Sequence, residues 1–337
     1  MKRFCILIFL GLWGNGALAL QQGLKLIGAD QIRHQYDGTG VSIAIIDSGV
    51  DSTHPMLGGS KACDQEHYRN DKVIGGWDSG EQDPLPCDIA AHGTSVAGIA
   101  AGLIPPQPAG PDGDYVGGVA PGAKIYALKI TKANGKVSSN AYLDALRWVA
   151  YHWNDDPENP IKVISNSNTW GKVEESCDAS TNNYERKIVA VLNQLDELGI
   201  TIFNSAGNAG FKQGLQWPGC MSLVHAVGAV SDTTQEIIGS SNSGALLSFF
   251  APANRAITLA PGGKYRVFGT TSAAAPYAAG SAAVIQQAAK DKLGYYLTPA
   301  EVVKLMTETG VILTDPASDP AISRPRVNLG KAIDQLK

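Results

Sequence analysis

The stretch VSIAIID, residues 41–47, decides the fold class, because it is almost entirely apolar until it ends at a carboxylate. A strand exposed on one face alternates apolar and polar side chains, whereas a near-continuous apolar run is typical of a strand buried on both faces of a parallel sheet. Such runs predict strands over residues 41–46, 124–130, 161–165, 200–204 and 223–230. The sequence therefore predicts a central sheet of mostly parallel strands.

Amphipathic helices are predicted between and after these strands. They cover residues 138–153, 185–199 and 298–310. Gly199 suits the left-handed position after a helix, and Thr298 with Glu301 forms a capping-box pattern at the start of the last helix. Strands that alternate with helices indicate an α/β fold, here a three-layer sandwich around a mostly parallel central sheet.

The charge pattern and the absence of repeats indicate one globular domain. Lys and Arg number 27 against 31 Asp and Glu, for a formal net charge of −4, and the two signs are interspersed. The chain has neither the basic stripe of a nucleic-acid-binding protein nor an acidic tail. We expect one domain over residues 20–337, with no separate propeptide domain, acting as a monomer without nucleic acid.

The first 19 residues have the pattern of a signal peptide. Lys2 and Arg3 precede an apolar run over residues 4–13, and small residues at 17 and 19 suit cleavage after Ala19. An uncleaved membrane anchor is the alternative, but the run is too short to span a bilayer comfortably. We therefore expect a secreted or periplasmic protein with no membrane contact after signal removal.

The cysteines agree with export. Cys5 lies in the signal segment, which leaves Cys63, Cys87, Cys177 and Cys220. An even number in an oxidising compartment indicates two disulfides, and four cysteines allow three pairings. We favour Cys63–Cys87 and Cys177–Cys220, since each pair brackets its own segment. Their spacing is too wide for a compact zinc site, and free buried thiols are the alternative.

An alanine-rich stretch near the C-terminus, VFGTTSAAAPYAAGSAAVIQ at residues 267–286, contains a proline. Proline inside a helix costs about 3 kcal/mol, but little in the first turn, where the N–H groups have no helical partner. Pro276 therefore predicts a helix start near Ser272. The Ser272 hydroxyl would lie beside free N–H donors, either as an ordinary N-cap or in a site that stabilises a negative oxygen.

Three further polar residues are expected near the carboxyl ends of predicted strands, where open parallel sheets bind ligands. Asp47 ends the first strand, His92 precedes a run of small residues, and Asn208 follows the strand near residue 200. Each of these residues, taken alone, also has an ordinary structural explanation. Asp47 could cap a turn, His92 could be a surface or satisfied core histidine, and Asn208 could be a left-handed turn residue.

Together with Ser272, these residue types match the needs of acyl transfer. A serine hydroxyl is a weak nucleophile until a base removes its proton, and histidine suits that task near neutral pH. A buried aspartate holds the imidazole tautomer and stabilises the imidazolium. An asparagine amide and the serine N–H can hold the oxyanion that develops. The order Asp47, His92, Ser272 is one of the orders in which such a triad occurs.

Four segments of the chain resemble the signature segments of the subtilisin-like serine proteases, the subtilases, in their order. They are IAIIDSGVDSTHP, AHGTSVAGIAAG, SAGNAG and TTSAAAPYAAG. The resemblance covers nearly all of the exported part and implies a subtilisin-like fold. It implies Asp47 as the catalytic acid, His92 as the general base, Ser272 as the nucleophile and Asn208 as an oxyanion-hole donor.

The chain also departs from the family pattern. Thr270 stands where the family's serine segment usually has glycine, and its β-carbon could crowd the substrate. Met56 follows Pro55 where an acidic calcium ligand is usual, so structural calcium is not supported there and is left open elsewhere. We expect no cofactor for the chemistry. Only about 27 residues, 20–46, precede Asp47, so we expect folding without a propeptide, helped by the disulfides.

The sequence therefore predicts a secreted serine endopeptidase that hydrolyses peptide bonds in protein or peptide substrates. One alternative is a catalytically inactive subtilase-like binding protein, which the altered Thr270 position supports. The other is a transpeptidase or peptide cyclase on the same scaffold, in which an amine outcompetes water at the acyl-enzyme.

Overall fold

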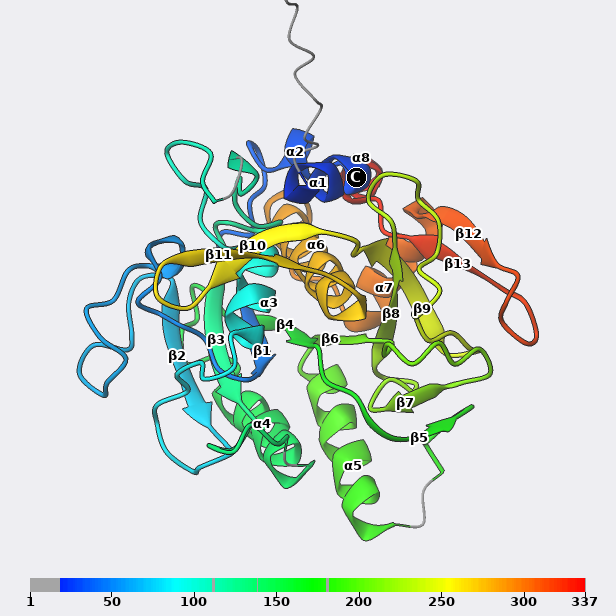
Figure 1. Cartoon of the computed structure of the whole chain (residues 1–337), viewed down its shortest axis with the longest axis horizontal. Helices are drawn as coiled ribbons and strands as arrows, with labels where there is room; N and C mark the ends of the chain where they lie inside the picture. The colour runs from blue at the N-terminus through cyan, green and yellow to red at the C-terminus, as the bar shows by residue number, and fades with distance from the viewer. Residues whose placement is uncertain (1–18, 111–112, 138, 180–181, 337) are drawn as a thin grey trace, which may run out of the picture.

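A nine-stranded sheet forms the centre of the molecule (Figure 1). The computed structural model describes residues 19–110, 113–137, 139–179 and 182–336, so the predicted signal peptide, apart from Ala19, lies outside the described residues. The strand order is β12-β13-β9-β8-β6-β4-β1-β3-β2, and every neighbouring pair is parallel except β12 with β13. The strands are β1 (Ser42–Asp47), β2 (Val73–Asp78), β3 (Lys124–Lys129), β4 (Ile161–Asn166), β6 (Thr201–Ser205), β8 (His225–Val230), β9 (Leu247–Pro252), β12 (Val311–Asp315) and β13 (Ile322–Arg326). The mostly parallel sheet is confirmed.

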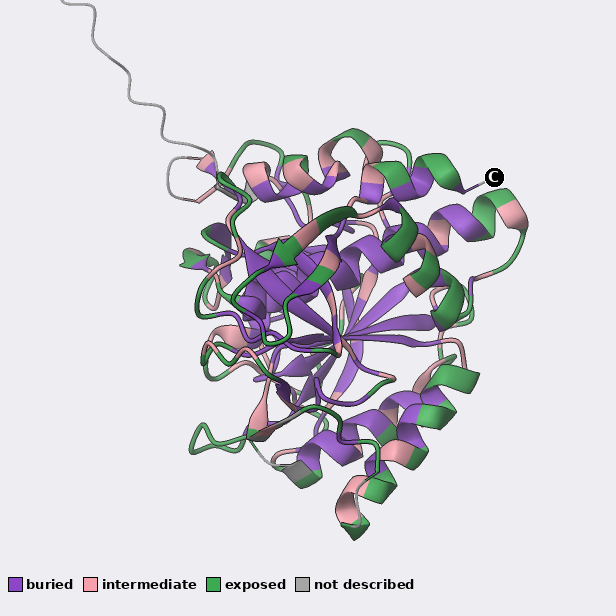
Figure 2. Ribbon diagram, turned by 90° about the vertical axis from the view of Figure 1, so that its right-hand side faces the viewer, coloured by how far each residue is buried: buried purple, intermediate pink, exposed green. Residues whose placement is uncertain are grey.

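Helices cover both faces of this sheet, which gives the predicted three layers (Figure 2). Side chains of β1 alternate between two hydrophobic clusters. Ile43 and Ile45 join the cluster that contains α3 and α6, whereas Ala44 and Ile46 join the cluster that contains α4 and α5. The helices are α1 (Ala19–Ile27), α2 (Ala29–Ile32), α3 (His92–Ala101), α4 (Ser139–His152), α5 (Asn183–Glu197), α6 (Thr271–Leu293), α7 (Pro299–Thr309) and α8 (Leu329–Gln335), with a short 3-10 helix η1 (Pro55–Leu57).

The predicted helix ends are mostly correct. Thr298 and Glu301 form a reciprocal capping box at the start of α7. Gly199 follows α5 with φ of 75°, in the left-handed region that glycine adopts without a β-carbon penalty. Among the described residues, no helix combines the length and hydropathy that a bilayer crossing needs.

The predicted helix start near Ser272 is confirmed, but the placement of Pro276 in the first turn is wrong. The helix begins at Thr271 and its N-cap is Thr270, so Ser272 is not the cap and Pro276 is the sixth helical residue, in the second turn. Pro276 therefore removes one helical hydrogen bond, the one that the Ser272 carbonyl would accept. The Ser167 hydroxyl donates to that carbonyl instead, over 3.1 Å. Proline in the second turn leaves this carbonyl without its helical donor, and the tertiary hydrogen bond from Ser167 offsets that loss.

The small residues of α6 allow close packing in the core. Residues 271–286 of this helix are all buried. A β-carbon added at Gly280 would lie 2.7 Å from the Ala100 carbonyl oxygen and 2.7 Å from the Val119 β-carbon. This close approach explains why an alanine- and glycine-rich sequence forms the central helix of the domain.

Several strands have no counterpart in the sequence prediction. The β10 (Ala256–Ala260) and β11 (Lys264–Phe268) strands form an antiparallel hairpin that lies across α3 in the view of Figure 1. The β5 (Trp170–Glu174) and β7 (Leu215–Trp217) strands form a second antiparallel pair. The β2, β9, β12 and β13 strands of the main sheet were also not predicted.

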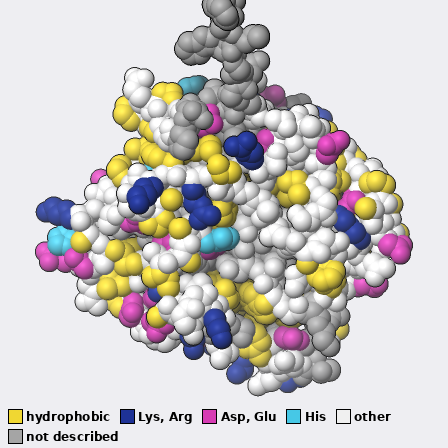
Figure 3. Space-filling view, in the orientation of Figure 1, with side chains coloured by type: hydrophobic (Ala, Val, Ile, Leu, Met, Phe, Trp, Pro, Cys, Tyr) yellow, Lys and Arg dark blue, Asp and Glu magenta, His cyan; other side chains and the backbone are white. Residues whose placement is uncertain are grey.

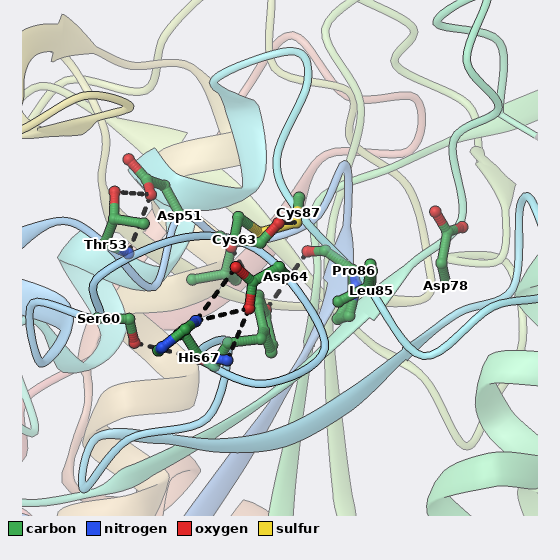
Figure 4. The surroundings of a disulfide bond; sticks show 12 residues. Asp51, Thr53, Ser60, Cys63, Asp64, His67, Asp78, Leu85, Pro86 and Cys87 are labelled. Atoms are coloured by element: carbon green, nitrogen blue, oxygen red, sulfur yellow. Dashed lines mark hydrogen bonds and ion pairs between the residues drawn. A yellow bond between two sulfur atoms is a disulfide. The ribbon is translucent and has the colours of Figure 1, made fainter.

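Both predicted disulfides are present. Cys63 bridges Cys87, with 6.0 Å between their Cα atoms, and closes the long loop region around β2. Figure 4 shows this bridge close to Asp64, whose Oδ1 lies 2.9 Å from Nδ1 of His67. Cys177 bridges Cys220 and joins the segment after β5 to the segment after β7.

Candidate active site

The carboxyl end of β1 places Asp47 in contact with His92. Asp47 is 1% exposed, and its Oδ1 accepts from the Ser48 backbone N–H at 2.7 Å and contacts His92 Nδ1 at 2.8 Å. An ionised carboxylate only accepts hydrogen bonds, so the proton lies on Nδ1 and leaves Nε2 as the acceptor of the neutral ring. The two residues are 45 positions apart in the sequence, and the fold brings them together as predicted.

The first turn of α3 is held by a carboxylate that the sequence analysis did not single out. Asp88 Oδ1 accepts from the backbone N–H groups of Ala90 and Ala91, and from the Ser48 hydroxyl at 2.8 Å. Its Oδ2 accepts from the Thr94 backbone N–H at 2.9 Å. Ala91 has φ of 62°, a left-handed value that this network holds just before His92. The signal available in the sequence was an aspartate four residues ahead of the histidine.

Two carboxylates raise the pKa of His92. Burial lowers the pKa of the imidazole, but the charge of Asp47, the hydrogen bond to it and the charge of Asp88 together outweigh burial and the opposing charge of Arg266. The pKa of His92 is therefore raised above its ordinary value of 6.5. Burial in turn raises the pKa of Asp88, against the hydrogen bonds that favour its ionised form.

The β10–β11 hairpin bounds the other side of the imidazole. The Phe268 ring lies edge-on to the His92 ring, with 5.0 Å between centroids and 75° between planes. The Arg266 guanidinium lies 5.7 Å from the centroid of the Phe268 ring. Asp51 Oδ2 accepts from the Gly262 backbone N–H at 2.7 Å, which ties the tip of the hairpin to the loop after β1.

Ser272 is the second residue of α6 and is 7% exposed. Its hydroxyl donates to the Ser167 carbonyl over 3.5 Å, a long and weak hydrogen bond. Among the hydrogen bonds of the described residues, none joins Ser272 to His92. The segment that carries Ser272 still reaches the imidazole, because Phe268 lies only four residues earlier in the chain.

Asn208 lies beside the N-terminus of α6, in the loop after β6, and is exposed. Its Oδ1 accepts from the Thr271 backbone N–H at 3.0 Å and from the Thr271 hydroxyl at 2.7 Å. A backbone N–H can only donate, so this contact identifies the amide atom beside Thr271 as Oδ1 and leaves Nδ2 as a donor. Nδ2 donates to no residue that the structure describes.

Thr270 has an unusual backbone conformation one residue before α6. Its φ is 63° and its ψ −170°, and the residue is exposed. A β-branched residue in this region is strained, whereas glycine adopts it readily. The departure from glycine that the sequence shows at this position therefore has a conformational cost.

The described part of the chain has no cluster of metal-ligating side chains. No group of three or more His, Cys, Asp and Glu side chains there could hold an ion. The Met56 side chain packs against the hydrophobic core.

Comparisons with known proteins agree with this architecture. The model of the subtilase family matches residues 38–325. A thermophilic serine proteinase of Bacillus sp. strain AK1 is 30% identical over 76% of this chain and 54% of its own length. An intracellular serine protease of Paenibacillus polymyxa is 30% identical over 84% of this chain and 78% of its own length.

Two further matches extend the comparison. Subtilisin E of Bacillus subtilis is 29% identical over 80% of this chain and 61% of its own length. The chain thus spans less than two thirds of some of the relatives that it matches. A crystal structure of a lanthipeptide protease superposes with a TM-score of 0.73 over 96% of this chain and 98% of its own, at 22% identity, which supports the fold alone. The two relatives at 30% identity are serine proteases. Because the family model matches residues 38–325, most of this chain, the chain belongs to the subtilase family.

Proposed function

We propose that this protein is a serine endopeptidase in which Asp47, His92 and Ser272 form the catalytic triad and Asn208 contributes to the oxyanion hole. The contact between buried Asp47 and His92 Nδ1 carries the proposal, because it leaves Nε2 free to accept a proton.

The reaction is acyl transfer to water. The Ser272 hydroxyl leaves its weak hydrogen bond to the Ser167 carbonyl and donates to His92 Nε2 instead. Its oxygen then attacks the peptide carbonyl carbon while Nε2 takes the proton. The carbonyl oxygen becomes an oxyanion. When the C–N bond breaks, His92 gives its proton to the leaving amine. Water then attacks the acyl ester, His92 takes a proton from it, and the carboxylic acid leaves as Ser272 regains a proton.

Two donors would hold the oxyanion. The contacts of Oδ1 with Thr271 hold the Asn208 side chain at the N-terminus of α6 and leave Nδ2 to donate. The Ser272 backbone N–H lies among the first N–H groups of α6, which have no partner within the helix. Both donors would be in place before substrate arrives, which is the condition under which such groups lower a barrier most.

The proposal includes protein or peptide substrates, a monomer and export to a periplasm or outside the cell, with no need for nucleic acid or for a cofactor in the chemistry. Two disulfides support an oxidising compartment. On the face drawn in Figure 3, the Lys and Arg side chains are scattered among acidic and apolar ones, without the continuous basic surface that nucleic acid requires.

Labelling with a fluorophosphonate probe, followed by mass mapping of the modified peptide, tests the nucleophile. We expect the probe to label Ser272, and we expect Ser272→Ala to lose both labelling and hydrolysis. Ser281→Ala is the control and should lose neither. Ser281 is a buried serine of the same helix, and its hydroxyl donates to the Tyr277 carbonyl. An unlabelled wild-type protein would favour the binding protein. Products lighter by one water than the hydrolysis products would favour the transpeptidase or cyclase.

A further inference from the structure

A cavity of about 440 Å³ lies between β2, β3 and α4. Its walls include Trp77, Tyr126 and Trp148. Tyr126 belongs to the hydrophobic cluster on the α4 side of the sheet, whereas its neighbours Ile125 and Ala127 belong to the cluster on the α3 and α6 side. The cavity is therefore on the opposite face of the sheet from the helices that carry His92 and Ser272, and it is separate from the candidate active site.

Aromatic rings form much of the wall. The Tyr126 and Trp148 ring centroids are 5.6 Å apart, with 54° between the planes. The Trp148 ring stacks on the His152 ring at 4.2 Å and 26°. Gly75 leaves room for this arrangement, since a β-carbon there would lie 2.7 Å from Cε1 of Tyr126. Ring faces placed at angles around a space of this size attract cations through their quadrupoles.

The charged groups at the cavity also favour a cation. Asp155 and Asp156, from the loop after α4, line it opposite a single exposed guanidinium, Arg69. Asp155 Oδ2 contacts His152 Nδ1 at 2.7 Å. Asp156 Oδ1 accepts from the Glu158 backbone N–H at 3.1 Å, which helps to hold the loop in place. Two carboxylates and one guanidinium line the cavity, so acidic side chains outnumber Arg and Lys there.

A hydroxyl on the cavity wall has no hydrogen-bond partner among the described residues. The Tyr126 residue is only 5% exposed, and its hydroxyl hydrogen-bonds none of the residues that the structure describes. Burial, followed by the charges of Asp155 and Asp156, raises the pKa of Tyr126 to about 12, against the charge of Arg69. The hydroxyl therefore keeps its proton at neutral pH and can hydrogen-bond a bound group.

We propose that this cavity is a second binding site, one that takes an organic cation of the size of a lysine or arginine side chain or a small quaternary ammonium ion. Aromatic faces would contact the cation, the carboxylates would balance its charge, and the Tyr126 hydroxyl would hydrogen-bond a polar atom beside it. The site stands independently of the proposed peptidase activity. Its cation could come from the side chain of a peptide or from a free small molecule.

Isothermal titration calorimetry of the full chain tests the site with single amino-acid derivatives. The probes are N-acetyl-lysine methylamide, N-acetyl-arginine methylamide and tetramethylammonium, and N-acetyl-norleucine methylamide is the uncharged control. We expect the cations to bind and norleucine not to bind, with affinity falling as salt rises. Binding of the amino-acid derivatives points to a peptide side chain, and binding of tetramethylammonium alone points to a free ammonium ion. Equal binding of norleucine, or no binding of any cation, would overturn the proposal.

Variants assign the binding to this cavity. Trp148→Leu and Asp155→Asn should each weaken cation binding by about tenfold, since each removes one attractive group. Asp144→Asn is the control. Asp144 lies on α4, as Trp148 does, but it pairs with Arg147 at 3.6 Å, so this variant should leave cation binding unchanged. The exposed Asp155 is a safe position for folding, and peptide hydrolysis should be unaffected in this variant. Unchanged affinity in Asp155→Asn and Trp148→Leu would place any observed binding elsewhere.

Discussion

The Ser167 hydroxyl donates to the main-chain carbonyl of Ser272, over 3.1 Å, at the one point of α6 where Pro276 removes the helical donor. Ser167 follows β4 and Ser272 lies near the start of α6, 105 positions later in the chain. This contact links the helix that carries the proposed nucleophile to the central sheet, and it gives the first prediction.

Ser167→Ala should lower the free energy of unfolding by about 1–3 kcal/mol, because it leaves a buried carbonyl without a donor. Urea unfolding measures this change. Ser165→Ala is the matched control, since the Ser165 hydroxyl is buried nearby on β4 and has no hydrogen-bond partner in the described structure. Similar unfolding free energies in the two variants would show that the Ser167 contact adds little.

Asn208→Ala should lower kcat by roughly 10²–10³-fold; the range comes from a subtilisin, a relative, and is carried over to this chain. Asn208→Asp separates catalysis from structure, because its carboxylate keeps an acceptor for Thr271 but cannot donate to an oxyanion. Steady-state kinetics should show a large loss of kcat in both variants, with the stability better preserved in Asn208→Asp. A normal kcat in either variant would remove Asn208 from the oxyanion hole.

Thr270→Gly should raise the free energy of unfolding by about 1 kcal/mol. Relief of backbone strain at φ of 63° contributes about 1–3 kcal/mol, and the greater freedom of glycine in the unfolded chain offsets about 0.5–1 kcal/mol of it. The residue is exposed, so little packing is lost. Thr270→Ala keeps the β-carbon and should gain much less, and equal effects of the two substitutions in denaturant titrations would argue against strain.

The acid limb of the kcat/KM profile should have its midpoint above pH 6.5, since catalysis needs neutral His92 and the pKa of this group is raised. Asp88→Asn removes one of the charges that raise it, so the midpoint should move to lower pH. Asp334→Asn, an exposed acidic residue of α8, serves as the control. An unchanged midpoint in Asp88→Asn would mean that Asp88 only shapes the loop.

Lys72 should make the protein more stable as pH rises from about 7 to 9. Burial lowers its pKa to about 7 from 10.5, so between these values the unfolded chain binds more protons than the folded one. Stability then rises by at most about 1.4 kcal/mol per pH unit, the value for one proton. Lys72→Met should flatten this slope in unfolding measurements at pH 7, 8 and 9, and the same slope in both proteins would contradict the pKa shift.

The parts of the fold that the sequence predicted are those with a local, periodic signal. The β1, β3, β4, β6 and β8 strands are buried apolar runs, and α4, α5 and α7 have one apolar face each. The β2 strand was missed because Gly75 and Gly76 interrupt its apolar pattern. The β11 strand, KYRVF, is mostly exposed, and the sequence analysis did not use its short alternation of polar and apolar residues.

The sequence alone determined the layered α/β architecture and the order of the four proposed site residues, because burial and residue type can be recognised in short segments. It favoured one of three cysteine pairings, and the structure contains that pairing. Only the tertiary structure decided how those segments meet. It placed His92 Nδ1 against Asp47, set Asp88 beneath the start of α3, and supplied Ser167 to the carbonyl that Pro276 leaves open. These contacts join residues that lie far apart in the chain or depend on a particular loop conformation, and no local pattern specifies either.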